Sequence, residues 1–247
     1  DIRTYIVPKI SDIIIRSAVE LNIFDSPLYL SRNEGLSLGQ ELCKRVCDVV
    51  FSLMALIISS PFFLIIALLI KIEDGGPVFY KQTRLTKDRR EFEIYKFRTM
   101  VVDAEKVCGA RLASEHDPRI TRVGKFLRAC RMDELPQLLN ILKGEMSIVG
   151  PRPERPELAR EIEKEMPEFA LRLKVKAGLT GYAQFYGKYN TTPYDKLKLD
   201  LTYIRNYSFI LDLKLMLLTP KILLMKESTE GVKEYRDASD GSGSRYL

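Results

Sequence analysis

The longest apolar segment of the chain has the length of a membrane helix and a break at its middle. Residues 49–70 are 22 consecutive residues without a charge. A straight helix of this length would be about 33 Å long, enough to cross the hydrocarbon core of a bilayer. Ser59-Ser60-Pro61 interrupts it. Because proline removes a backbone donor and clashes with the preceding turn, we expect a kink there that leaves each half with roughly half the bilayer thickness.

The charges that flank this segment have the same sign at both ends. Lys44-Arg45 precede it and Lys71 follows it. Since positive charge favours the cytoplasmic side, a re-entrant helix-break-helix over residues 44–72 that enters and leaves by one face fits both the flanks and the break at Ser60 and Pro61. A kinked spanning helix fits the same residues equally well, so both topologies stay open.

Helical spacing predicts two amphipathic helices in the middle of the chain and further helices near its end. The expected stripes are Val123, Phe126, Leu127 and Cys130, then Leu135, Leu138, Leu139 and Leu142. Lys143-Gly144 is a typical helix end. Residues 194–225 read as helical, with a stripe of Leu197, Leu201 and Ile204. Residues 210–218 are apolar enough to lie in a membrane interface or in a core.

Strand signals are few and short. They cover residues 78–80, 91–97 and 146–149, with a polar loop at 83–90 and a loop rich in glycine and aromatic residues at 178–190. The pattern predicts a mainly helical α+β fold with a small β element. We divide the chain into a leader (1–43), the membrane hairpin (44–72), a catalytic domain (73–226) and a polar tail (227–247).

Composition excludes several classes of protein. The 247 residues are 46% apolar and 29% charged, which excludes a disordered or fibrous chain. Four cysteines without a Cys-x-x-Cys motif, and a single histidine, argue against a disulfide scaffold, zinc chemistry and a Ser-His-Asp triad. Residues 71–131 hold 15 basic and 9 acidic residues, a surplus equal to the net charge of +6. Such a cluster suits an anionic partner: phosphate, nucleotide, nucleic acid or acidic lipid.

Two groups of residues are candidates for phosphate chemistry. Asp133-Glu134 lies between the two amphipathic helices, where Asp133 could simply cap the second helix or could be a nucleophile toward phosphorus, with Glu134 holding Mg²⁺. Arg152 stands between two prolines, which make a stiff loop that presents one guanidinium. Lys96 and Arg98 place two more cations near a strand end, as phosphate ligands or as a solvated edge.

Taken in order, the motifs resemble the bacterial sugar transferase family, the monotopic polyprenyl-phosphate phosphoglycosyl transferases. They are the hairpin broken at Ser60-Pro61, Tyr95-Lys96-Phe97-Arg98-Thr99-Met100, Asp133-Glu134-Leu135-Pro136-Gln137, Gly150-Pro151-Arg152-Pro153, Gly178-Leu179-Thr180-Gly181-Tyr182-Ala183-Gln184, Lys198-Leu199-Asp200-Leu201 and Leu211-Asp212-Leu213-Lys214. The resemblance covers about residues 40–226, and the leader resembles the linker of long-form members. One departure is Tyr182-Ala183-Gln184-Phe185-Tyr186-Gly187-Lys188, where many members read Trp-Ala-Gln-Val-Asn-Gly-Arg.

The resemblance implies a reaction and a set of site residues. A sugar-1-phosphate would move from a nucleotide diphospho-sugar, usually a UDP-sugar, to polyprenyl phosphate with release of UMP, at the cytoplasmic face of the bacterial inner membrane. Asp133 would be the nucleophile, and Glu134 the ligand of the cofactor Mg²⁺. Substrate-binding roles fall to Lys96, Arg98, Arg128, Arg152 and Gln184.

The expected partners follow from this reaction, and one rival class stays open. The partners are the nucleotide sugar, the polyprenyl phosphate and the bilayer, with a homo-oligomer left open and no nucleic acid. The rival is a membrane-anchored module that binds acidic lipid or nucleic acid through residues 71–131. It explains the charge and the anchor, but it gives no role to Asp133-Glu134 or to Arg152.

Overall fold

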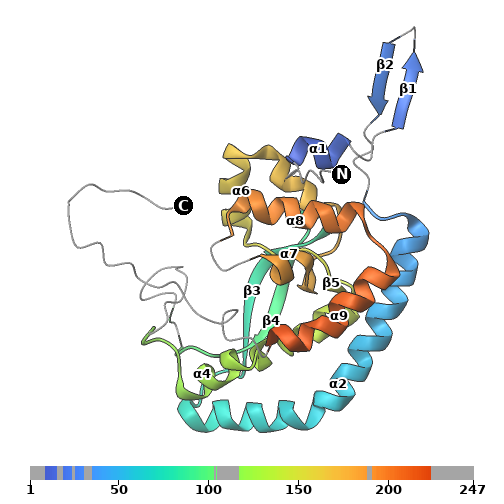
Figure 1. The fold of residues 1–247 in the computed structure, drawn as a ribbon. Coiled ribbons are helices and arrows are strands. Elements are labelled where there is room, and N and C mark those ends of the chain that lie inside the picture. The colour runs from blue at the N-terminus through green and yellow to red at the C-terminus, as the bar shows by residue number, and fades with distance from the viewer. Residues whose placement is uncertain are drawn as a thin grey trace, which may run out of the picture.

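The computed structural model describes residues 9–15, 19–23, 26–30, 35–102, 104, 117–187 and 191–223 (Figure 1). The polar tail expected at 227–247 lies outside these residues, as does Lys188. Helices dominate, and the strands form three two-stranded sheets within the described ranges, so the mainly helical α+β class is confirmed. The elements are α1 (Ile10–Ile15), β1 (Val19–Ile23), β2 (Ser26–Leu30), α2 (Leu38–Asp74), β3 (Phe79–Leu85), η1 (Lys87–Arg89), β4 (Glu91–Phe97), α4 (Arg122–Ala129), η2 (Met132–Glu134), α5 (Gln137–Lys143), β5 (Ser147–Val149), α6 (Pro156–Glu165), η3 (Pro167–Lys174), β6 (Gly178–Thr180), α7 (Tyr182–Tyr186), α8 (Pro193–Arg205) and α9 (Phe209–Leu223).

Helix α2 is longer than the hairpin that the sequence predicts. It begins after Ser37, which forms a capping box with Gln40, and it ends at Gly75, whose φ of 69° is left-handed. Its apolar residues face outward, since only 17% of its most apolar 18-residue stretch is buried. By length and composition it is the one helix among the described residues that could cross a membrane.

The predicted break is present as a bend within one helix. Figure 1 shows α2 turning sharply near its middle, between its blue and cyan parts. The Ser60 hydroxyl donates to the Ile57 carbonyl oxygen at 2.9 Å. That oxygen would accept from residue 61 in a regular helix, and Pro61 has no N–H to give. The serine therefore satisfies the backbone group that the proline leaves open.

The N-terminal part of α2 is fixed to the globular body by buried polar contacts. The Lys44 ammonium donates to Asp212 of α9 at 2.5 Å and to the Tyr203 hydroxyl of α8 at 3.2 Å. One turn later, Asp48 accepts from the Ser147 hydroxyl at 3.0 Å. Lys44 is buried in an ion pair and Asp48 is buried with hydrogen bonds, and these contacts fix the register of α2 against α8, α9 and β5.

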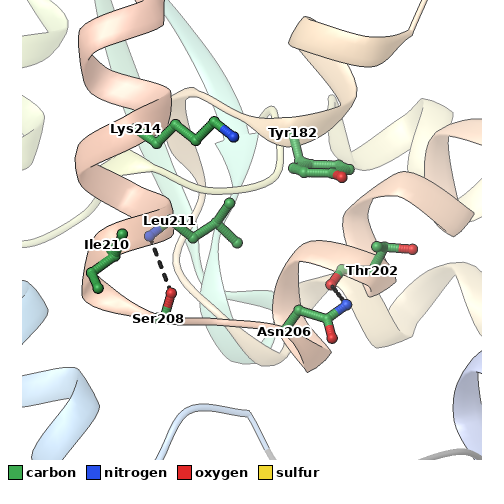
Figure 2. Close-up of a pocket in the computed structure, with 7 residues that line it drawn as sticks. All are labelled: Tyr182, Thr202, Asn206, Ser208, Ile210, Leu211 and Lys214. Carbon is green, nitrogen blue, oxygen red and sulfur yellow. Dashed lines mark hydrogen bonds between the residues drawn. The ribbon is translucent and has the colours of Figure 1, made fainter.

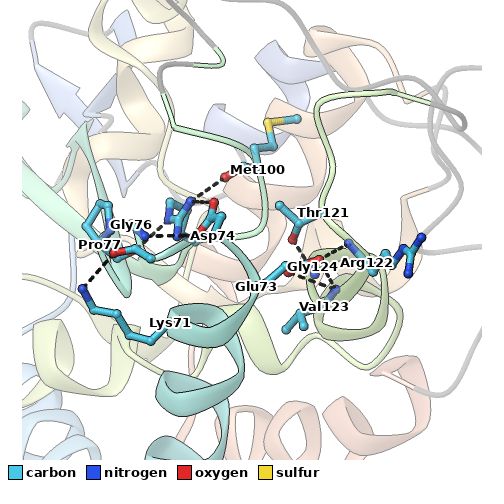
Figure 3. Close-up of polar contacts among 12 residues, drawn as sticks. Lys71, Glu73, Asp74, Gly76, Pro77, Met100, Thr121, Arg122, Val123 and Gly124 are labelled. Atoms are coloured by element: carbon cyan, nitrogen blue, oxygen red, sulfur yellow. Dashed lines mark hydrogen bonds and ion pairs between the residues drawn. The ribbon is translucent and has the colours of Figure 1, made fainter.

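The C-terminal end of α2 is attached to the same body (Figure 3). The Glu73 carboxylate accepts from the backbone N–H of Arg122 at 2.7 Å and of Val123 at 3.3 Å, and so caps the first turn of α4. Ile66 and Ile70 pack on Phe97 of β4 and Leu127 of α4. Both ends of the bent helix thus dock on one folded unit.

Strands β3 and β4 form an antiparallel hairpin in full seven-residue register, from Phe79 opposite Phe97 to Leu85 opposite Glu91. Strand β4 has the predicted bounds. Strand β3 is longer than predicted, because pairing with β4 extends it into the polar stretch expected as a loop at 83–90. Phe92 and Ile94 point inward, as their alternation predicts.

The buried faces of α4 and α5 differ from the predicted stripes. Leu127 is buried, but Phe126 is 62% exposed. In α5 the buried apolar residues are Leu138 and Ile141, whereas Leu139 is at the surface. The face is set by the polar residue Asn140, whose amide accepts from the Tyr95 N–H at 3.0 Å and donates to the Glu93 carbonyl at 2.7 Å. The spacing of apolar residues along the chain does not predict such a polar contact.

The largest core lies between α1, η3, α8 and α9. The stripe of Leu197, Leu201 and Ile204 is buried there as predicted. Ile10 joins it, so the leader contributes to the same core. Helix α9 has one buried side, at Asp212 and Leu215, while its opposite side is exposed.

The segment predicted as a loop at 178–190 instead contains β6 and α7. Strand β6 pairs in parallel with β5, with Ser147 opposite Gly178 and Val149 opposite Thr180. This pairing is made between residues about thirty positions apart, so local composition could not indicate it.

Candidate active site

The Asp133-Glu134 pair lies in η2, a 3₁₀ turn between α4 and α5. The chain reverses at Arg131, whose φ of 56° is left-handed, a conformation that costs energy for a residue other than glycine. The N-cap of α5 is Pro136, so the interpretation of Asp133 as a helix cap is wrong.

Glu134 is buried among cations. Its Oε1 accepts from Lys96 Nζ at 3.0 Å and from Arg152 Nη2 at 2.8 Å, and Arg131 Nη1 lies 4.0 Å away. Burial by itself would raise the pKa of Glu134, but Arg152, Lys96 and Arg131 outweigh it and hold that pKa far below its usual range. Glu134 is therefore a permanent negative charge that orients two cations.

Asp133 has a different environment. No residue in the described part of the chain makes a hydrogen bond to its carboxylate. Burial and the charge of Glu134 raise the pKa of Asp133, and Lys96, Arg128 and Arg131 oppose this rise. An unpaired carboxylate with a raised pKa is more basic than a paired one, which suits a nucleophile.

The Arg152 loop is held from two sides. The Gly150 N–H donates to the Thr180 carbonyl at 2.8 Å, next to the β5–β6 pairing. The Arg172 side chain donates to the Arg152 carbonyl at 3.0 Å, and Arg172 is itself fixed by Asp200, with its Nε 2.9 Å from Oδ2. The guanidinium of Arg152 is thus positioned by more than its two flanking prolines.

The structure brings Arg128 to the site and places Arg98 elsewhere. Arg128 Nε donates to the Thr99 hydroxyl at 2.8 Å; burial lowers the pKa of Arg128, and the charge of Asp133 opposes this effect. Arg98 forms a paired contact with Asp74 and donates to the Pro77 carbonyl at 2.6 Å. Figure 3 shows Asp74 with Gly76, Pro77 and Met100 at the end of α2. Arg98 therefore joins α2 to the loop after β4.

Gln184 lies on α7, and no described contact joins it to Glu134 or Arg152. Its Nε2 is buried without a hydrogen-bond partner among the described residues. Helix α7 also borders a cavity of about 400 Å³ between α8 and α9 (Figure 2). The residues that line it are Tyr182, Thr202, Asn206, Ser208, Ile210, Leu211 and Lys214.

Comparisons with known proteins identify the family of this chain. Residues 39–226, from the second residue of α2 to beyond the end of α9, match the model of the family described as bacterial sugar transferase. The chain belongs to the bacterial sugar transferase family. Its two motifs at Asp133-Glu134 and Arg152, 18 residues apart, meet at one carboxylate oxygen of Glu134 in the folded transferase.

Named relatives of this sugar transferase come from several bacteria. A UDP-N-acetylgalactosamine-undecaprenyl-phosphate N-acetylgalactosaminephosphotransferase of Aeromonas hydrophila is 41% identical over 184 residues, 73% of this chain and 43% of the relative. A UDP-glucose:undecaprenyl-phosphate glucose-1-phosphate transferase of Escherichia coli is 40% identical over 199 residues, 78% of this chain and 42% of the relative. The chain thus spans less than half of these two proteins. An exopolysaccharide production protein of Rhizobium leguminosarum is 40% identical over 181 residues, 70% of this chain and 90% of the relative.

The carboxylates of the transferase fit Mg²⁺ only if a substrate supplies the remaining ligands. Among the described residues, no group of three or more His, Cys, Asp or Glu side chains could hold a metal ion. Mg²⁺ needs few protein ligands, because it takes one or two carboxylates together with substrate phosphates and water. Glu134 uses Oε1 for its cations, and Asp133 has no hydrogen-bond partner in the part described. The adjacent carboxylates therefore fit an ion that arrives with a phosphorylated substrate.

Arg84 is a further cation beside Lys96 and Arg152 that the sequence pattern did not indicate. It lies within β3 and not in the polar loop expected at 83–90. Its Nη1 donates to the Pro153 carbonyl of the Arg152 loop at 3.2 Å. A strand predicted through residue 85 would have placed Arg84 and Gln82 on one face by alternation, and this was the available signal.

Proposed function

We propose that this transferase moves a sugar-1-phosphate from a UDP-sugar to undecaprenyl phosphate, with release of UMP, in the first membrane step of polysaccharide or glycoconjugate assembly. The observation that carries the proposal is that the two adjacent carboxylates of η2 have different environments. Glu134 is bound by Lys96 and Arg152, while its neighbour Asp133 is left unpaired beside them. A membrane-anchored binding module has no need of such an unpaired carboxylate.

In the first half-reaction, an Asp133 oxygen attacks the phosphorus that carries the sugar. The bond from this phosphorus to the oxygen that bridges the two phosphates breaks, and UMP leaves with that oxygen and its electron pair. The product is a phosphosugar joined to Asp133 as an acyl phosphate. Arg152 and Lys96, held by Glu134, are placed to offset charge on the phosphoryl oxygens.

In the second half-reaction, a phosphate oxygen of undecaprenyl phosphate attacks the same phosphorus. The bond to the Asp133 oxygen breaks, the carboxylate is regenerated, and a polyprenyl-diphospho-sugar forms. A ping-pong scheme follows, because UMP leaves before the acceptor reacts.

We assign Mg²⁺ as the cofactor, with Glu134 and the substrate phosphates as its ligands. Bound there, the ion would supply positive charge to the diphosphate. We expect EDTA to abolish turnover and added Mg²⁺ to restore it, and Glu134→Gln to raise the Mg²⁺ concentration needed for half-maximal rate. Full activity in EDTA would remove the metal from the proposal.

We further propose that α2 is re-entrant, that both of its ends face the cytoplasm, and that the site lies at the inner-membrane surface. Support comes from its two attachments: Lys44 near its start binds α9, and Glu73 at its end caps α4 of the same body. A spanning helix would place these attachments on opposite sides of the bilayer. The residues around the bend, including Ile58 and Leu64, are exposed and apolar.

The direct test is UMP release. Purified protein is incubated with a panel of UDP-sugars, with and without undecaprenyl phosphate. We expect one or a few sugars to give catalytic UMP release that requires the acceptor, together with a lipid-linked diphospho-sugar. Absence of UMP release with every sugar would overturn the proposed reaction.

A further inference from the structure

A small cavity lies beside the Glu134 cluster and is lined by three cations. Its volume is about 20 Å³, room for a single oxygen-sized group. Lys96 and Arg152 line it, and the third cation is Arg84. The other lining residues are Ile94, Gln137, Pro153 and Gly178. Within the described residues, no carboxylate lines this cavity.

Arg84 reaches the cavity from the inward face of the β3–β4 hairpin. Its Nη1 is held by the Pro153 carbonyl and its Nη2 donates to Gln82 Oε1 at 2.6 Å. Its Nε is buried and has no hydrogen-bond partner in the described part of the chain. Because a buried N–H is seldom left without an acceptor, this donor indicates a group that binds there.

The charges around Arg84 favour an anion. Burial lowers the pKa of Arg84, Arg155 and Arg152 lower it further, and Glu154 opposes them. Glu154 is already shared by Lys196 and Arg172, and Glu134 by Lys96 and Arg152. Glu154 and Glu134 are therefore already bound by other cations, and a phosphoryl oxygen would relieve the mutual repulsion of the three cations that line the cavity.

We propose that Arg84 binds an oxygen of the donor's diphosphate, on the phosphate that leaves as UMP. This inference rests on the proposed function. A phosphoryl group at Asp133 can meet Arg152 and Lys96, and Arg84 lines the small cavity beside these two cations, held to the Pro153 carbonyl of the Arg152 loop. A diphosphate has a second phosphorus to reach it, whereas the acceptor's monophosphate has none.

The test measures binding apart from turnover. Affinity for UMP and for undecaprenyl phosphate is determined by calorimetry in detergent, for wild type, Arg84→Gln and Arg84→Lys. We expect Arg84→Gln to weaken UMP binding roughly tenfold or more and to raise the donor KM similarly, with the acceptor KM unchanged. Arg84→Lys keeps the charge and should recover part of the UMP affinity.

A matched control removes the same charge from the same strand. Lys81 lies on the outward face of β3, in an exposed ion pair with Glu93, so Lys81→Gln should leave UMP affinity unchanged. Equal UMP affinity in wild type and Arg84→Gln would overturn the proposal. A loss confined to undecaprenyl phosphate, or competition by inorganic phosphate as strong as by UMP, would also overturn it, because the anion would then not be the donor's.

The outcomes separate this inference from the proposed function. If wild-type protein releases no UMP from any sugar, the reaction fails, whatever Arg84 binds. In another outcome, wild type is active while Arg84→Gln lowers kcat and leaves both KM values and the UMP affinity constant. Arg84 would then only position the Pro153 carbonyl. That result would overturn the inference about Arg84 and leave the proposed reaction standing.

Discussion

The Ser60 hydroxyl donates to the Ile57 carbonyl oxygen at 2.9 Å, at the bend of α2. The partner that Pro61 removes is replaced within the same turn, so the bend can lie in lipid without an open backbone acceptor. A bend that needs no outside partner supports a re-entrant hairpin.

This relationship predicts the effect of restoring a straight helix. Ser60→Leu with Pro61→Leu returns the backbone donor and leaves an apolar helix of about 33 Å, long enough to span. We expect part of the population to place the residues before Lys44 across the membrane. Cysteine-accessibility labelling in cells, on a background without native cysteines, reads the two sides with one probe before Lys44 and one after Lys71.

Ser60→Ala alone is the matched control, since it keeps Pro61 and hence the bend. It should leave both probes on the cytoplasmic face. If the unmodified protein shows its two probes on opposite faces, the re-entrant topology is wrong and α2 is an ordinary spanning helix.

Replacing the nucleophile should abolish turnover and labelling together. Asp133→Asn keeps size and shape but cannot form an acyl phosphate, so activity should fall to background. Wild type incubated with a UDP-sugar labelled in the sugar phosphate, without acceptor, should retain label on the protein, whereas Asp133→Asn should retain none. Thermal unfolding of the variant checks that it folds. Label that persists in Asp133→Asn would assign the nucleophile to another residue.

The raised pKa of Asp133 predicts the pH at which the rate of protein labelling falls on the acid side. The nucleophile must be deprotonated, so the labelling rate should fall at a pH above the ordinary carboxyl value of 3.8. Lys96 lowers the pKa of Asp133, so removing this charge in Lys96→Met should move the acid limb to higher pH. Lys81→Met, an exposed position on the same hairpin, should not move it. An acid limb that shifts downward in Lys96→Met would contradict this electrostatic account.

The buried pair of Lys44 and Asp212 predicts a large stability effect. Both side chains are 7% exposed, so Asp212→Asn leaves a buried ammonium without its counter-charge. The free energy of unfolding should fall by about 3–5 kcal/mol, and Lys44→Met with Asp212→Leu should recover most of it. Glu93→Gln, which breaks an exposed pair with Lys81, should cost about 0–1 kcal/mol. Denaturant titration in detergent compares them, and an equal cost for both pairs would contradict the burial argument.

Local sequence was enough to predict the features that depend on neighbouring residues. The apolar length of α2 and its bend at Pro61 follow from local backbone chemistry, as do the end of α5 at Gly144 and the strand at 91–97. The ordered motifs also indicated the family. Each of these signals lies within a few residues of the feature that it predicts.

Which residues meet at the site depends on the tertiary structure. It brought Lys96 and Arg152 to one oxygen of Glu134, took Arg98 away to Asp74, and added Arg84 from a presumed loop. A long cation can pair with any carboxylate within reach, and its spacing along the chain does not say which. Three features determine which cation meets which carboxylate: the pairing of β3 with β4, the left-handed turn at Arg131 and the docking of both ends of α2. They do so because they fix backbone positions that lie far apart in sequence.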